Sequence, residues 1–121
     1  MKKWKKFKDI EGKQQFPVLD KISYEYGDLL IAVDFSNGEL KTVKCTESFS
    51  FRVIDEGNTF RTIYAQDFDG ITWIFTTDSS NLIDWFNFES EFMYKDNLQS
   101  YIVATQNQLI EFLTYSEIEI I

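Results

Sequence analysis

The amino-acid sequence predicts a single α+β domain, a mostly antiparallel β-sheet with about two helices packed on it. Its length of 121 residues is typical of one domain, and strand-like segments outnumber the segments with helical spacing. Hydrophobic residues make up 44% of the chain and aromatic residues 17%, which is enough to build a core and excludes a mainly disordered chain. Because no linker-like stretch or internal repeat interrupts the sequence, residues 1–121 are expected to form one domain.

Six segments have the composition and alternation of β-strands. An Asn37-Gly38 pair, the preferred sequence of a type I′ turn, joins residues 29–35 to residues 40–46 and predicts a β-hairpin. Residues 48–54 alternate apolar and polar side chains, which is typical of a half-buried strand. The expected strands are residues 29–35, 40–46, 48–54, 71–77, 101–104 and 116–121.

Two segments space their apolar residues three and four apart, as amphipathic helices do. The first, residues 80–88, begins at a run of capping residues that ends in Ser80. The second, residues 106–115, follows Thr105, which forms a capping-box pattern with Gln108. Both segments are expected to be helices that pack on the sheet.

The N-terminal part of the chain has no clear period, and Pro17 argues against a helix through Phe16. Five lysines lie among the first eight residues, with Trp4 and Phe7 between them. We interpret residues 1–12 as a Lys-rich, loosely packed segment that is solvated or lies against the acidic half of the chain. Contact with anionic lipid or nucleic acid is the alternative.

The sequence carries no predicted export or membrane segment. Polar residues follow the basic start where a signal peptide needs an apolar stretch. The longest apolar run, residues 29–33, is far shorter than the roughly 18 residues of a transmembrane helix. With a single cysteine, the chain is expected to be a cytoplasmic bacterial protein that does not bind membranes.

Acidic residues are concentrated in the C-terminal half. The formal net charge of the chain is −8. Residues 62–121 hold ten acidic residues and one basic residue, Lys95, so this half alone has a net charge of −9. Such a charge repels phosphate backbones and attracts basic proteins, so direct nucleic-acid binding is not expected. Solubility is the alternative reason for the charge.

Composition excludes most catalytic and metal chemistry. The chain has no His, one Cys and five widely spaced Gly, which excludes His-dependent catalysis, Cys/His zinc sites and glycine-rich nucleotide loops. No cofactor and no metal are expected, and the protein is predicted not to be an enzyme. Paired carboxylates such as Glu89 with Glu91, or Asp55 with Glu56, keep a carboxylate-only enzyme as an alternative.

Two further patterns are more typical of structure than of chemistry. Residues 67–70 look like the middle of a calcium loop, but Ala65 and Thr76 stand where that loop needs acidic residues, so an acidic turn is expected. Cys45 lies on a predicted strand and is expected to be a small core residue. A thiolate with a pKa lowered by Lys44 is the alternative.

Aromatic residues divide into a predicted core and a predicted interface. The expected core aromatics are Phe49, Phe51, Trp73, Phe75, Trp85 and Phe86. Residues 88–97 mix aromatic side chains with carboxylates and have no clear period. This mixture is typical of a protein interface, and a connection packed on its own core is the alternative.

A family resemblance adds to these patterns. It is carried by residues 51–57, the Trp85-Phe86 pair, residues 101–105, the Leu109-Ile110 pair and a Glu-rich end. Over residues 48–121 the chain resembles immunity proteins of contact-dependent growth inhibition and related polymorphic toxin systems. The resemblance implies a cytoplasmic protein that binds one cognate toxin domain and blocks it without catalysis. It transfers no contact residues.

The sequence thus favours an immunity protein that neutralises a cognate toxin domain, expected to be a nuclease, through an acidic surface. The predicted toxin-binding residues are Asp67, Asp69, Asp84, Glu89, Glu91, Phe92, Tyr94 and Asp96. One alternative is a nucleic-acid-mimicking inhibitor of phage or plasmid origin. Another is a non-catalytic structural protein that dimerises through the sheet edge at residues 116–121. The protein is accordingly expected to be a monomer or a homodimer.

Overall fold

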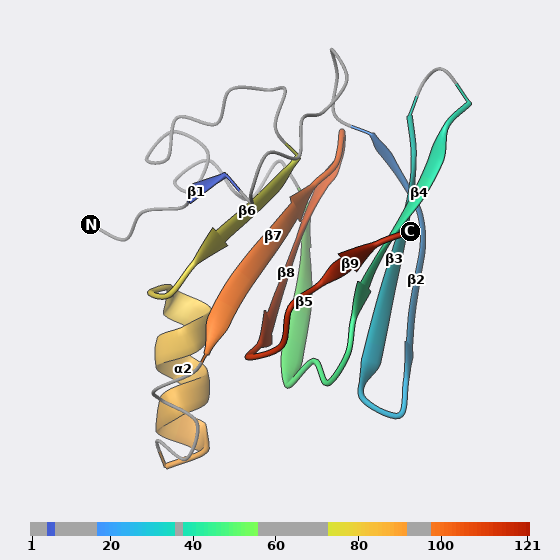
Figure 1. Ribbon diagram of the computed structural model, residues 1–121. Helices are drawn as coiled ribbons and strands as arrows, with labels where there is room; N and C mark the ends of the chain where they lie inside the picture. Colours follow the sequence, from blue (N-terminus) through green and yellow to red (C-terminus); the bar gives the residue numbers. More distant parts are fainter. Residues whose placement is uncertain (1–4, 7–16, 36–37, 56–72, 92–97) are drawn as a thin grey trace.

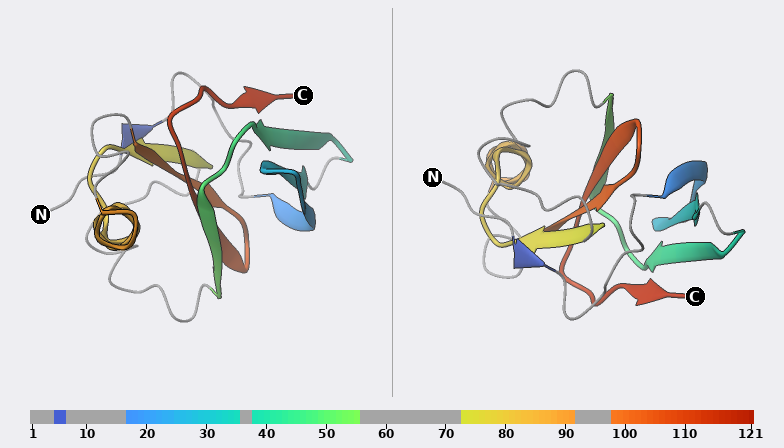
Figure 2. Two further views of the ribbon diagram at one scale, coloured as in Figure 1. Left: turned by 90° about the horizontal axis from the view of Figure 1, so that it is seen from below. Right: turned by 90° about the horizontal axis from the view of Figure 1, so that it is seen from above.

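Alternating apolar residues build two antiparallel sheets that face each other, and a helix lies on the far side of the larger one (Figure 1, Figure 2). The computed structural model describes residues 5–6, 17–35, 38–55, 73–91 and 98–121. The five-stranded sheet has the order β1 (Lys5–Lys6), β6 (Ile74–Thr77), β7 (Gln99–Ala104), β8 (Gln108–Thr114) and β5 (Ser50–Asp55). The four-stranded sheet has the order β2 (Val18–Glu25), β3 (Asp28–Asp34), β4 (Leu40–Cys45) and β9 (Glu119–Ile120).

The main core lies between the two sheets. Every second residue of β3, from Leu29 to Val33, points inward and is fully buried. The opposing sheet contributes Trp73, whose ring meets that of Phe35 edge to face with centroids 5.4 Å apart. Tyr101 and Phe112, register partners on β7 and β8, stack in the same core. These contacts hold the two sheets together.

The helix α2 (Asn81–Glu89) covers one end of the outer face of the five-stranded sheet, opposite the four-stranded sheet (Figure 2). Its buried residues Leu82 and Ile83 pack with Leu98 and with Leu113 of β8. Strand β8 therefore has apolar neighbours on both faces, and its residues from Leu109 to Thr114 are all buried.

A charged pair is built into this outer face. Glu111 of β8 is 3% exposed, and its Oε1 accepts hydrogen bonds from Arg52 Nε at 3.0 Å and from Arg52 Nη2 at 2.6 Å. Its Oε2 accepts a hydrogen bond from Ser100 Oγ at 2.6 Å. Because both carboxylate oxygens are satisfied, the charge is tolerated within a largely apolar face.

The predicted fold class is confirmed at the level of a mostly antiparallel sheet protein with a helix, since 58% of the described residues are in strands. The second predicted helix, residues 106–115, is wrong, because this segment is strand β8. Thr105 and Gln108 do bond as expected, with Gln108 N–H donating to Thr105 Oγ1 at 3.0 Å, but they close the β7–β8 hairpin. The apolar residues on both sides of Glu111, Leu109, Ile110, Phe112 and Leu113, reflect burial on two faces, which periodicity does not distinguish from a helix.

The other element predictions hold with small shifts. The hairpin of residues 29–35 and 40–46 is confirmed as β3 and β4, although Asn37 of its turn lies outside the described residues. Residues 116–121 contain β9, which pairs with β4 and forms an edge of the four-stranded sheet. Of the Lys-rich segment, Lys5 and Lys6 pair with β6. The sequence pattern does not predict strand β2.

Candidate functional site

Helix α2 begins at the N-cap residue Ser80, as the sequence predicts. The Ser80 hydroxyl accepts a hydrogen bond from Ile83 N–H at 3.2 Å, and the Ser80 carbonyl accepts one from Asp84 N–H at 3.0 Å. Asp84 lies in the first turn, where a carboxylate is favoured by the helix dipole. The N-terminus of the predicted helix at residues 80–88 is thereby confirmed.

One face of α2 is anchored on the sheet. Besides Leu82 and Ile83, Phe86 packs inward and stacks on Phe49, with ring centroids 5.7 Å apart. Phe49 in turn contacts Tyr115, whose ring centroid lies 5.0 Å away. The helix is thus held by an apolar cluster that reaches into the segments before β5 and after β8.

The opposite face of α2 presents two large aromatic side chains to solvent. Trp85 is 53% exposed and Phe88 is 73% exposed, one helical turn apart. The prediction that Trp85 belongs to the core is wrong, because it lies about 100° around the helix from the centre of the buried stripe. Phe88 is the first residue of the predicted interface segment, and its side chain is accessible to a partner. Exposed aromatic rings at this spacing are typical of a binding surface.

Carboxylates border the two rings. Asp84 and Glu89 are exposed on α2, and Glu91 is exposed in the turn that follows. In this turn Ser90 N–H and Oγ both donate to the Phe86 carbonyl, and Glu91 adopts a left-handed φ of 54°. We call the set Asp84, Trp85, Phe88, Glu89 and Glu91 the α2 surface. It brings together three of the predicted toxin-binding residues.

The same end of the molecule is acidic beyond α2. Figure 1 shows that the C-terminal end of α2, the β2–β3 turn, the β4–β5 connection and the β8–β9 connection lie toward one end. These segments and their flanks carry the carboxylates of Glu25, Asp28, Glu47, Glu89, Glu91 and Glu117. The basic residues nearest this end in the described chain are Lys44 near the end of β4 and Arg52 near the start of β5, and Arg52 is paired with Glu111. The end therefore has a negative potential that favours a basic partner.

The remaining predicted site residues lie outside the described residues; they are Asp67, Asp69, Phe92, Tyr94 and Asp96. Trp85 is the residue that the sequence reasoning missed as a binding residue. Its position around the helix axis could have identified it. Leu82, Ile83 and Phe86 form the buried side of α2, and Trp85 points away from that side.

Other candidate chemistry finds no support in the described part of the chain. Cys45 is 1% exposed, and burial raises the pKa of its thiol to about 11, so the predicted core role is confirmed and the thiolate alternative is wrong. No group of three potential metal ligands occurs among the described residues. Within those same residues, no helix has the length and apolar character needed to cross a membrane.

Comparison with known proteins finds no match to this chain among family models, curated proteins or solved structures.

Proposed function

We propose that the protein is an immunity protein that binds a cognate toxin domain and blocks it, with no catalysis of its own. The observation that carries the proposal is the α2 surface, where Trp85 and Phe88 project into solvent between three carboxylates. The toxin domain it fits is a nuclease, because a nuclease needs a basic cleft to bind its phosphate backbone. The family resemblance over residues 48–121 and a cytoplasmic location belong to the same proposal.

The energetics of the α2 surface suit tight binding. Buried aromatic anchors contribute most of the binding energy of a typical interface, and a charged rim around them excludes mismatched partners. The rings of Trp85 and Phe88 lose little conformational entropy on binding, because each side chain has only two rotatable bonds. The cluster of Leu82, Ile83 and Phe86 holds α2 on the sheet, so the surface is largely preformed.

The charges favour fast and selective association. Glu89 and Glu91 lie on the acidic end of the molecule and Asp84 lies in the first turn of α2, and a basic nuclease cleft is attracted to such a surface before contact. Occupying that cleft with carboxylates excludes the phosphate backbone of the substrate. Inhibition then needs no chemical step, which agrees with a chain that has no His.

The test is co-expression with the product of the adjacent upstream reading frame, with growth and co-purification as readouts. We expect the protein to rescue growth and to form a complex that weakens at high salt. The Trp85→Ala, Phe88→Ala double variant is expected to lose at least about 100-fold in affinity, since each ring behaves as an anchor. A matched control is Leu40→Ala, Val53→Ala, which removes side chains that are 66% and 47% exposed elsewhere.

A charge-reversal variant tests the contribution of the carboxylates to binding separately from that of the aromatic rings. Asp84→Lys, Glu89→Lys changes the net charge by the same amount as the control Asp20→Lys, Asp34→Lys on the four-stranded sheet. We expect only the first pair to slow association and to reduce its dependence on salt. Full rescue by the Trp85→Ala, Phe88→Ala variant contradicts the proposal, as does a harmless neighbour that forms no complex.

A further inference from the structure

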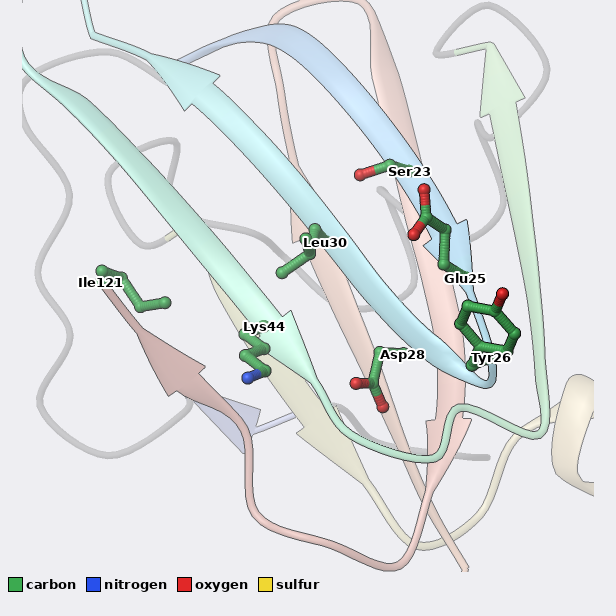
Figure 3. Close-up of a pocket in the computed structure, with 7 residues that line it drawn as sticks. All are labelled: Ser23, Glu25, Tyr26, Asp28, Leu30, Lys44 and Ile121. Carbon is green, nitrogen blue, oxygen red and sulfur yellow. The ribbon is translucent and has the colours of Figure 1, made fainter.

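A groove of about 470 Å³ lies on the outer face of the four-stranded sheet, next to the β2–β3 turn (Figure 3). It is separate from the α2 surface, which lies beyond the other sheet. Its apolar lining residues are Leu30, which is half-buried, and Ile121, which is exposed. Glu25, Tyr26 and Asp28 line it on the side of the turn, and Lys44 lines it from β4. The groove thus combines apolar, aromatic and charged groups within reach of one small ligand group.

Two of these groups are carboxylates at opposed backbone positions; Figure 3 shows that of Glu25 turned toward Ser23 and that of Asp28 turned the other way. Glu25 and Asp28 are register partners that flank the turn, so both side chains leave the same face of the sheet. Like charges at opposed positions of an antiparallel pair destabilise it. Asp28 Oδ1 accepts a weak hydrogen bond from Glu47 N–H at 3.4 Å, and within the described chain neither carboxylate has a cation within ion-pair distance. A bound cation therefore relieves a repulsion that the fold itself maintains.

Tyr26 supplies an aromatic face beside these carboxylates. It occupies the first position of the two-residue turn with a left-handed φ of 53°, a conformation that an aromatic residue rarely adopts. Its side chain is fully exposed, so the strained backbone is not compensated by packing of the ring. An exposed aromatic ring next to carboxylates can stack on a planar cation.

We propose that this groove binds the guanidinium of an arginine side chain presented by a partner protein. The guanidinium is planar and has five N–H donors, enough to serve both Glu25 and Asp28, and its methylene stem can contact the apolar side chains of Leu30 and Ile121. Two carboxylate side chains against the single ammonium of Lys44 leave the groove net negative, which favours a cationic ligand. Two of the side chains that line the groove are carboxylates, and no group of three His, Cys, Asp or Glu side chains that could hold a metal occurs in the described chain, so the lining side chains favour an organic cation.

The proposal does not depend on a toxin partner, because a blocked amino acid tests it. The full chain, labelled with nitrogen-15, is titrated with Nα-acetyl-arginine amide. We expect saturable shifts at the amides of Tyr26, Leu30 and Ile121, with a dissociation constant in the millimolar range. Glu25→Gln and Asp28→Asn should each weaken binding about fivefold, and Asn keeps an oxygen to accept from Glu47 N–H. Lys44→Met should tighten binding about threefold, because it removes a like charge.

Controls distinguish a site from general acidity. Asp34→Asn removes a carboxylate from the other end of β3 and should leave the affinity unchanged. Amide shifts outside the groove report whether each variant keeps the fold. Equal shifts with Nα-acetyl-norleucine amide, or equal losses in Glu25→Gln and Asp34→Asn, overturn the proposal. Binding of Nα-acetyl-lysine amide as tight as that of the arginine probe overturns the assignment to a guanidinium.

Discussion

The outer faces of the two sheets differ in what lies on them. On the five-stranded sheet, Leu109, Glu111 and Leu113 of β8 point outward and are at most 3% exposed. On the four-stranded sheet, the outward residues Leu30 and Ala32 of β3 are half-buried and Asp34 is exposed. Helix α2 covers one end of the first face, whereas no described element packs on the second.

This difference separates stability from binding. The covered face buries apolar area on both sides of one strand, so it contributes to the free energy of unfolding and fixes the position of α2. The open face of the four-stranded sheet contributes less to stability, and its side chains are accessible to ligands. Each proposed binding surface lies on the solvent side of an element whose other side is buried: the α2 surface on helix α2, and the groove on the four-stranded sheet.

The largest expected effect comes from the covered face. Leu113→Ala removes a fully buried side chain that contacts α2 and should lower the free energy of unfolding by about 3 to 4 kcal/mol. Leu30→Ala on the open face should cost about 1 kcal/mol, because that side chain is already partly in water. Urea denaturation measures both values. Equal losses would show that the two faces do not differ in this way.

A second contrast lies between an ion pair with a buried carboxylate and an ion pair in which both side chains are partly exposed. Arg52→Met leaves Glu111 buried without its cation and should cost about 2 kcal/mol. Lys41→Met breaks the partly exposed pair with Glu39, 3.2 Å apart, and should cost less than about 0.5 kcal/mol. The double variant Arg52→Met, Glu111→Met should recover most of the first loss. Urea denaturation of all three variants checks the order, and a cost for Lys41→Met as large as that for Arg52→Met contradicts it.

The core between the sheets can be probed by pH through Cys45. Its pKa is raised from 9.0 to about 11 in the folded protein, because burial disfavours the thiolate. The unfolded chain therefore loses this proton first, and stability should fall by about 1 to 2 kcal/mol between pH 9 and pH 11. Cys45→Ala lacks this contribution, so the difference in stability between the two proteins should shrink across that interval. A constant difference would place the thiol in a more polar environment.

The smallest of the four main effects lies at the β2–β3 turn on the open face. Tyr26→Gly should stabilise the protein by about 1 kcal/mol, because glycine adopts the left-handed φ of 53° without strain. Thermal unfolding measures the gain. Tyr24→Gly, two residues earlier within β2, is the control and should lower the stability of the protein. Tyr24 contacts Phe51 of the other sheet, with ring centroids 5.3 Å apart. A loss of stability in Tyr26→Gly would mean that its ring is packed.

The difference between strands buried on one face and strands buried on both explains which strands the sequence predicts correctly. Strand β3 alternates between a buried and an open face, so the apolar pattern of residues 29–35 identifies it and its hairpin partner. Strand β8 is buried on both faces, so its apolar residues recur at the three- and four-residue spacing of a helix. These residues are Leu109, Ile110, Phe112 and Leu113. Strand β2 escapes prediction because it lies at an edge and its pairing shifts between Leu19 and Lys21, which breaks the alternation.

The candidate site was predictable in part for a related reason. Ser80 and the stripe of Leu82, Ile83 and Phe86 predict α2 from local chemistry alone. The exposure of Trp85 depends on how wide the buried stripe is, which is decided by the sheet beneath it. The groove at Glu25 and Asp28 depends on β2, which the sequence pattern does not identify, so no local motif predicts it.

The most direct test of the central claim is site-specific photo-crosslinking on the α2 surface. A benzophenone amino acid is placed at position 88 or, as the control, at position 40; the native side chains there are 73% and 66% exposed. Each protein is co-expressed with the product of the adjacent upstream reading frame and irradiated. We predict a covalent adduct with that product from position 88 and none from position 40. A complex that crosslinks from position 40 but not from position 88 would contradict binding through the α2 surface.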